Sequence, residues 1–129
     1  MPPAREPEAV TALYELMLWA LPARPPAERS EAWRVTGRLP RSHRFTVGQK
    51  IEETLIDALR LLVKAQYRRQ NEKLLEDANE RVDLVRYLVR LMHDLHMVSS
   101  DQYGKFCDRL LSVGRQIGGW KKTSSGTDS

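Results

Sequence analysis

Apolar residues recur at intervals of three and four along four segments of the chain, which is the spacing of one face of an α-helix. The segments are residues 6–21, 51–67, 74–95 and 98–120. Strand signals are almost absent, because no alternating β-branched run and no Asn-Gly or Asp-Gly turn occurs. The pattern therefore predicts an all-α protein with four helices.

Each segment carries one apolar face that we expect to form the core, and some apolar residues lie outside these faces. The extra residues include Leu16, Leu18, Leu84 and Leu91. Because helices with wide apolar faces tend to associate, they favour oligomerisation. The expected core faces are Val10, Leu13, Tyr14, Met17 and Leu21; Ile51, Leu55, Ile56, Leu59, Leu62, Val63 and Tyr67; Leu74, Leu75, Ala78, Val82, Val85, Leu88, Val89, Met92 and Leu95; and Tyr103, Phe106, Cys107, Leu110, Val113, Ile117 and Trp120.

Local signals mark several helix ends. Ser99 and Gln102 have the spacing of a capping box, in which each side chain bonds the backbone N–H of the other residue. Thr46 and Gln49 have the same spacing, although Ser42 could cap an earlier start. Pro22 stops or kinks the first helix. On the third helix, the pairs Asp77–Arg81 and Asp83–Arg86 are spaced for ion pairs.

The connections between the segments predict the topology. Those joining the second, third and fourth helices are short, so these helices should be antiparallel neighbours. The link between the first and second helices contains four prolines and is too long for a plain turn. We therefore expect an antiparallel four-helix bundle as a single domain over residues 1–129. It would carry a Pro/Arg-rich insertion at about residues 22–39 and a disordered tail at about residues 122–129.

The composition indicates a net positive charge and gives few clues to the cellular compartment. The net charge is +4, and fifteen of the 21 basic residues are arginine. This balance is compatible with a nucleic-acid partner. No apolar run reaches the roughly 18 residues that a membrane span needs, and the N-terminus lacks a signal-peptide layout. A single cysteine, Cys107, fits a reducing compartment, so we expect a cytoplasmic protein without a membrane partner.

Signals for catalysis or metal binding are weak. The chain has no serine-nucleophile, P-loop, zinc-protease or dinucleotide-binding motif. His93 and His96 are three residues apart, which suits two ligands of one metal, but the third ligand would have to be Asp94, Cys107 or His43. The Glu-x-x-His pairs of di-metal bundles are also missing. We expect no enzyme activity, no bound metal and no cofactor.

The basic residues are the main candidates for function. The planar guanidinium of arginine suits bidentate phosphate contacts, and a helix N-terminus adds oriented N–H groups. Alternatively, these arginines pair with acidic residues of neighbouring helices or of another subunit. The candidate nucleic-acid or partner-binding residues are Arg38, Arg41, His43 and Arg44 before the second helix, Arg68 and Arg69 after it, and Arg86 and Arg90 on the third helix.

Three stretches of the chain resemble a known family. They are "LPRSHRFTVGQKIEETLIDALRLLVKAQY", "ANERVDLVRYLVRLMHDL" and "SSDQYGKFCDRLLSVGRQIGGW". Together, and in this order, their "PRSHRFT-x-GQ" and "IGGW" motifs look like the four-helix-bundle family that contains Avd. Its members are accessory variability proteins of diversity-generating retroelements, and their relatives are encoded by 23S rRNA intervening sequences. The stretch "PARPPAERSEAWRVTGR" departs from the family pattern as an insertion.

The resemblance implies a non-enzymatic, barrel-like homo-oligomer, expected to be a pentamer. It implies binding of the retroelement reverse transcriptase and its template RNA or cDNA, in support of mutagenic retrohoming. Residues 40–45 match the family motif, and their charged members become nucleic-acid or partner candidates. The alternative is a stand-alone basic helical oligomer that binds structured RNA.

Overall fold

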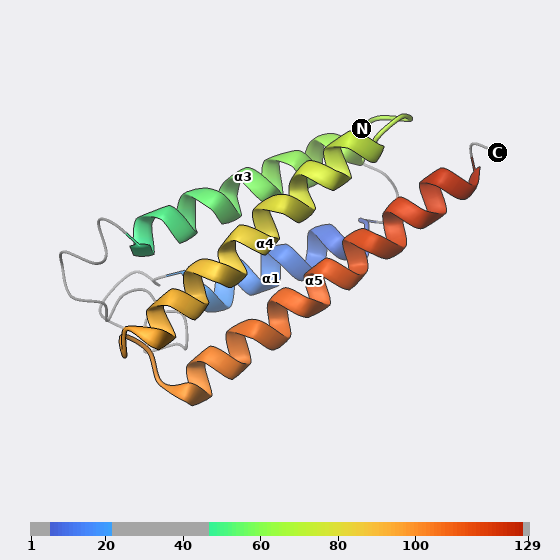
Figure 1. Ribbon diagram of the computed structural model, residues 1–129. Coiled ribbons are helices and arrows are strands. Elements are labelled where there is room, and N and C mark those ends of the chain that lie inside the picture. Colours follow the sequence, from blue (N-terminus) through green and yellow to red (C-terminus); the bar gives the residue numbers. More distant parts are fainter. Residues whose placement is uncertain (1–5, 22–46, 128–129) are drawn as a thin grey trace.

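Four helices form the described part of the protein. The computed structural model describes residues 6–21 and 47–127, with side chains up to residue 124. The helices are α1 (Glu8–Ala20), α3 (Gln49–Ala65), α4 (Glu72–Asp94) and α5 (Ser100–Thr127), and the described residues contain no strand. Successive helices run in opposite directions and pack side by side (Figure 1). The prediction of an all-α protein with four packed helices is confirmed.

The core lies between the four helices, and each helix contributes buried residues to it. α3 packs on α4, α4 packs on α5, and α1 closes the bundle between α5 and α3. Leu13, Leu55, Val85 and Leu110 are fully buried, one from each helix. Burial of such a side chain stabilises the fold by about 1.5–3 kcal/mol. The buried apolar faces of the four helices therefore hold the helices together in this arrangement.

An aromatic contact joins α1 to α5. The ring of Trp19 meets the ring of Phe106 edge to face, with centroids 5.3 Å apart and an interplanar angle of 84°. The guanidinium of Arg109 lies over the Trp19 ring, 4.8 Å from its centroid. Phe106 is buried, so this contact ties α1 to the core. One basic residue of α5 is thereby engaged within the chain.

The expected core faces were too wide in places. Tyr14, Ile56, Val63, Tyr67 and Leu95 were expected in the core, but their side chains are exposed. Tyr67 and Leu95 lie just beyond the last residues of α3 and α4, and the other three lie at the edges of their apolar faces. The three-to-four spacing fixes the direction of an apolar face, whereas its width depends on how the neighbouring helices pack. In contrast, Leu16, which lay outside the expected face of α1, is buried.

The helix ends follow the local sequence where the structure describes them. The hydroxyl of Ser99 accepts a hydrogen bond from the backbone N–H of Gln102 at 3.1 Å, and the Gln102 side chain accepts one from the N–H of Ser99 at 3.2 Å. The capping box is therefore confirmed. Leu21, before Pro22, has the extended backbone that a following proline favours. Thr46 and Ser42 lie outside the described residues.

α4 ends in a Schellman motif. The N–H of His96 donates to the carbonyl of His93 at 2.9 Å, and the N–H of Met97 donates to the carbonyl of Met92 at 2.8 Å. This motif requires a left-handed residue, and His96 supplies it with φ of 61°. His96 therefore serves the turn between α4 and α5.

A buried asparagine fixes the turn between α3 and α4. Asn71 is 6% exposed, although it lies in a connection of six residues. Its side-chain amide donates to the carbonyl of Ala65 at 3.2 Å and to that of Arg68 at 3.4 Å. The Ala65 carbonyl, at the end of α3, also accepts the backbone N–H of Arg68 at 3.1 Å, so the Asn71 amide adds its bonds to a turn that is already hydrogen-bonded to the helix end. The turn that carries Arg68 and Arg69 is thus held to the core.

The C-terminal helix is longer than its apolar face. The sequence placed a disordered tail at about residues 122–129, whereas α5 continues to Thr127. The hydroxyl of Thr123 donates to the carbonyl of Gly119 at 2.9 Å, and Lys121 pairs with Glu76 of α4 at 3.0 Å. Both contacts involve residues of α5 beyond Trp120. The expected insertion at residues 22–39 lies outside the described residues.

Candidate nucleic-acid and partner interface

The candidate residues divide into three groups. Arg38, Arg41, His43 and Arg44 lie outside the described residues, so their candidacy rests on the sequence alone. Two further groups lie on the surface of the bundle and are exposed. They are Arg68 with Arg69 in the α3–α4 turn, and Arg86 with Arg90 on α4.

The turn group presents positive charge on the surface of the described bundle. Arg68 and Arg69 are exposed and form no ion pair with any of the described residues. Lys64 lies one turn earlier in the chain, in the last turn of α3. Unpaired guanidinium groups keep all their donors for a ligand, and arginine is suited to phosphate oxygens. The geometry is compatible with a phosphate backbone at this end of the bundle.

The second group lines a groove between α4 and α5. Arg86 and Arg90 are one helical turn apart, and the groove beside them has a volume of about 300 Å³. Two aromatic side chains, Tyr87 of α4 and Tyr103 of α5, also line it. The sequence indicated the arginines but not these tyrosines. Their neighbourhood depends on the way α5 packs against α4, which helical spacing within one segment does not show. The remaining lining residues are Asp83, Cys107 and Leu111.

Both groove arginines have weak acidic partners on their own helix. Arg86 Nη1 lies 3.3 Å from Asp83 Oδ1, which confirms the predicted Asp83–Arg86 pair. Arg90 Nε lies 3.8 Å from Asp94 Oδ2. All four side chains are about half exposed or more, and such surface pairs contribute about 0.2–1 kcal/mol. Each pair occupies one nitrogen of its guanidinium, so other donors remain available.

The opposite wall of the groove is held in place by contacts around Tyr103. Its ring stacks on the His93 imidazole at a centroid distance of 4.4 Å and an angle of 14°. Nε2 of this imidazole lies 3.2 Å from Ser100 Oγ. A hydrogen bond with Cys107 raises the pKa of the Tyr103 hydroxyl above its ordinary value. His93, one of the two weak metal-ligand candidates, therefore positions an aromatic ring in the wall.

The two arginine groups do not form one continuous site. Arg86 lies 14 residues after Glu72, the first residue of α4, while Arg68 and Arg69 precede that residue. At the rise of an α-helix this separation amounts to about 21 Å along the axis. A ligand that contacts both groups must therefore extend along the bundle.

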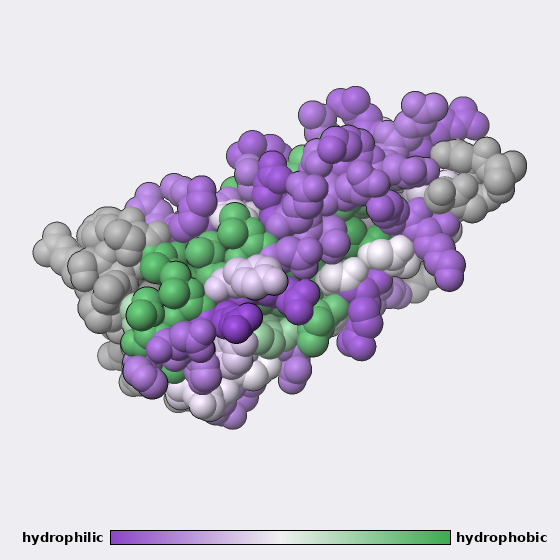
Figure 2. Space-filling view, viewed as in Figure 1, coloured by the Kyte–Doolittle hydropathy of each residue, from purple (hydrophilic) through white to green (hydrophobic). Residues whose placement is uncertain are grey.

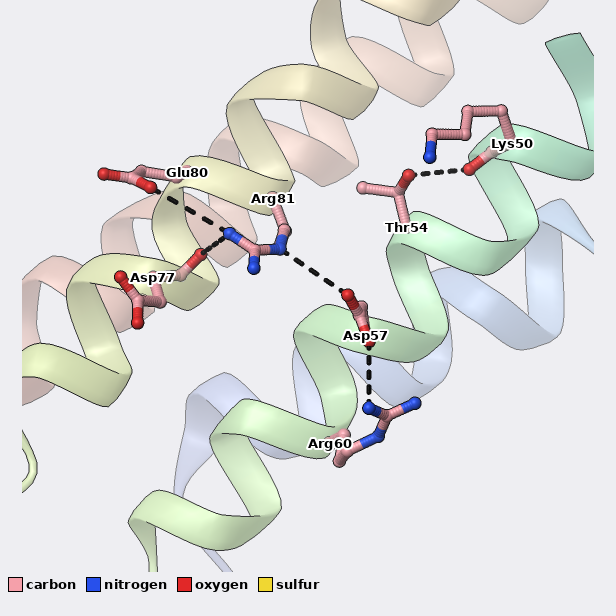
Figure 3. Close-up of polar contacts among 7 residues, drawn as sticks. All are labelled: Lys50, Thr54, Asp57, Arg60, Asp77, Glu80 and Arg81. Carbon is pink, nitrogen blue, oxygen red and sulfur yellow. Dashed lines mark hydrogen bonds and ion pairs between the residues drawn. The ribbon is translucent and has the colours of Figure 1, made fainter.

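Arg81, between these groups along α4, has a structural role that the sequence did not predict. The expected Asp77–Arg81 ion pair is wrong: the Asp77 carboxylate pairs with Lys73 at 3.2 Å, and Arg81 contacts Asp77 through the backbone carbonyl, at 3.5 Å. As Figure 3 shows, Arg81 instead reaches Asp57 of α3 at 3.6 Å. Spacing within a helix does not reveal a competing partner on another helix. Arg81 thus joins α3 to α4.

An apolar stripe (Leu84, Leu88, Leu91 and Leu95) runs along the outer side of α4. Leu84, Leu91 and Leu95 are 42%, 43% and 54% exposed, and Leu88 is partly buried. Figure 2 shows apolar side chains gathered over the C-terminal half of α4. The spacing of four, three and four residues places all four on one helix face. The sequence indicated Leu84 and Leu91 as extra apolar residues, but it assigned Leu88 and Leu95 to the core.

No helix among the described residues is long and apolar enough to cross a lipid bilayer. No curated protein and no solved structure matches the chain. One family does match: the model of the bAvd-like family aligns with residues 28–124, a span that includes α3, α4 and most of α5. Because this span covers most of the chain and agrees with the resemblance to Avd proteins, the protein belongs to the bAvd-like family.

Proposed function

We propose that this protein is a non-enzymatic accessory protein of a diversity-generating retroelement. It binds the reverse transcriptase and the template RNA or cDNA as a homo-oligomer and supports mutagenic retrohoming in the cytoplasm. The observation that carries the proposal is membership of the bAvd-like family. The exposed arginines of the helical bundle support it, because they offer contacts for a polyanion.

The turn arginines are the strongest support for the nucleic-acid part of the proposal. Arg68 and Arg69 are exposed and form no ion pair among the described residues, so a phosphate competes with none of the described carboxylates for them. Each phosphate contact releases counterions, so affinity should fall steeply as salt concentration rises. Arg38, Arg41, His43 and Arg44 are further proposed contacts from the sequence motif.

The apolar stripe of α4 supports self-association. Three of its four leucines, Leu84, Leu91 and Leu95, are exposed in the single chain, and covering them with a second copy removes apolar surface from water. Assembly also concentrates charge, since the net charge of +4 is repeated in each subunit. We propose a barrel-like pentamer, the form implied by the resemblance to Avd.

The first test is co-purification with the reverse transcriptase encoded nearest in the genome, with nuclease added to half of the sample. Retention after nuclease supports direct binding of the polymerase. Loss after nuclease means that RNA bridges the two proteins. Absence of association in both halves contradicts the retroelement role and favours a stand-alone RNA-binding protein.

A second test separates specific phosphate contacts from net charge. The variant Arg68→Ala/Arg69→Ala should bind RNA more weakly, and the slope of log affinity against log salt should fall by about 1.5–2. The control Arg60→Ala/Lys105→Ala removes the same charge from residues that already pair with Asp57 and Asp101. If the two variants lower RNA affinity equally, the turn arginines act only through the net charge of the protein and not through specific phosphate contacts.

A third test concerns assembly. Leu91→Asp places a charge within the apolar stripe and should lower the mass measured by light scattering, while the helical circular dichroism is kept. Ile56→Asp, at an exposed isoleucine of α3 outside the stripe, is the matched control. If Leu91→Asp keeps the assembly mass of the wild type, the stripe is not the subunit interface.

A further inference from the structure

The α4–α5 groove has features that phosphate binding alone does not require. Besides two arginines, it is lined by two tyrosines and a leucine, and it is a half-open groove with a volume of about 300 Å³. Contacts to a duplex backbone need only exposed donors, as in the α3–α4 turn. Aromatic rings beside arginines are instead typical of surfaces that bind single-stranded nucleic acids, where bases stack on the rings.

We propose that this groove binds single-stranded nucleic acid, with one base stacked on Tyr87 and adjoining phosphates held by Arg86 and Arg90. The inference rests on the proposed nucleic-acid-binding function and adds a place and a strand type to it. The remaining wall, formed by α5, accommodates the edge of the base. The turn arginines lie outside this groove.

Tyr87 is the side chain that can accept a base. It is 67% exposed, the highest exposure among the large apolar and aromatic residues that the structure describes. It lies three residues from Arg90 and next to Arg86, so a base on its ring and phosphates on the arginines are within one turn of α4. An exposed aromatic ring gains by stacking because its face leaves water.

Tyr103 has a different role from Tyr87, because its ring already stacks on another side chain of the protein. It stacks on the His93 imidazole with centroids 4.4 Å apart, so it forms a fixed wall. Leu111, which is exposed in the same groove, supplies apolar surface. A flat apolar base fits between these side chains better than a hydrated phosphate does. The wall and the exposed ring therefore define opposite sides of one cleft.

The size of the groove favours a single strand. Its volume of about 300 Å³ is at the lower limit of small-ligand pockets, which suits about one nucleotide. The bases of a duplex are stacked inside the double helix and cannot enter it without unpairing. A single strand presents unpaired bases, which pack onto aromatic rings at no such cost. A duplex would therefore contact only the exposed arginines.

The acidic partners of the arginines do not prevent phosphate binding. The contacts to Asp83 and Asp94 are exposed and each uses one nitrogen, at 3.3 and 3.8 Å. Surface pairs of this kind are weak, whereas an arginine fork binds phosphate with two parallel hydrogen bonds. The aspartates instead limit the positive potential of the groove. Binding should consequently depend on the stacked base as well as on charge.

The test compares fluorescence anisotropy of labelled oligouridine and of a duplex of equal length. Tyr87→Ala should weaken oligouridine binding by about 5- to 150-fold, the effect of losing one stacked base, and should leave duplex binding nearly unchanged. Tyr87→Phe should retain wild-type affinity because the ring is kept. Tyr14→Ala, at an exposed tyrosine of α1, is the matched control and should also bind as wild type does.

The outcomes separate this inference from the proposed function. If the wild type binds no RNA even at low salt, the nucleic-acid part of the proposed function fails. If the wild type binds and Tyr87→Ala binds equally well, only the groove assignment is overturned. It is also overturned if Tyr14→Ala or Tyr87→Phe loses as much affinity. Loss of reverse transcriptase with unchanged RNA binding in Tyr87→Ala would assign the groove to a protein partner.

Discussion

Asn71 offers a sharp test of how the α3–α4 turn is held. Replacement by aspartate keeps the shape of the side chain but exchanges the amide nitrogen for an oxygen. That oxygen would face the carbonyls of Ala65 and Arg68, which now accept hydrogen bonds at 3.2 and 3.4 Å. The site is 6% exposed, so water cannot replace the lost bonds. Asn71→Asp should therefore destabilise the folded state strongly at neutral pH.

The size of the effect follows from the contacts. Two hydrogen bonds contribute about 1 kcal/mol each, and a buried ionised carboxylate without a donor adds a further cost, so the total loss should be at least about 3 kcal/mol. Asn71→Ala loses the same two bonds, but it also removes the side-chain oxygen, which has no hydrogen-bond donor among the described residues. We expect the alanine variant to lose only about 1–2 kcal/mol.

The assay is urea unfolding followed by circular dichroism, at one protein concentration because association adds to stability. The folded state disfavours the ionised form, so the pKa of the introduced carboxyl should be raised above its unfolded value. The penalty of Asn71→Asp is then full above the folded-state pKa and shrinks as pH falls towards about 4. An aspartate variant as stable as the alanine variant at pH 7.5, or a penalty independent of pH, would refute the reasoning.

Three further predictions concern other helix ends and one carboxylate. His96→Gly should raise the free energy of unfolding by about 0.5–1 kcal/mol in urea titrations, because glycine adopts the left-handed conformation of His96 at less cost; lower stability would contradict this. Ser99→Ala should lose about 1 kcal/mol through loss of the cap, and an unchanged urea midpoint would argue against that role. Burial, and secondarily Glu53, raises the pKa of Glu52, so its ionised form destabilises the fold. Glu52→Gln should therefore raise the urea midpoint at pH 7, and this gain should vanish as pH falls below about 4.5, whereas a gain at every pH would exclude a charge effect.

Local features of the fold could be predicted from the sequence because their partners lie within one or two helical turns. The Ser99–Gln102 capping box is such a case, since both residues belong to one helix start. The Asp77–Arg81 pair shows the limit of this reasoning. Its spacing was suitable, but the Arg81 guanidinium pairs instead with Asp57, which lies 24 residues earlier in the chain. Competition between helices depends on packing, which the spacing within one helix does not contain.

The candidate site was predictable only in part for the same reason. Arg86 and Arg90 were indicated by their charge and by their spacing on one helix. Tyr87 was not indicated, because an exposed tyrosine gains significance only beside a groove. Tyr103 was assigned to the core face, and the structure shows that it is half-buried at the groove wall. Which helix faces meet at a groove is decided by tertiary packing.

The position of α1 in the chain has a consequence for the order of folding. In sequence, 28 residues separate α1 from α3, whereas six separate α3 from α4. Closing the longer connection costs about 1.4 kcal/mol more in chain entropy. The antiparallel pairs formed by α3, α4 and α5 should therefore assemble first, and α1 should dock last. In the native state, the free energy of opening measured by hydrogen exchange should be lower for amide protons of α1 than for those of α4. The bundle would therefore open first at its N-terminal helix.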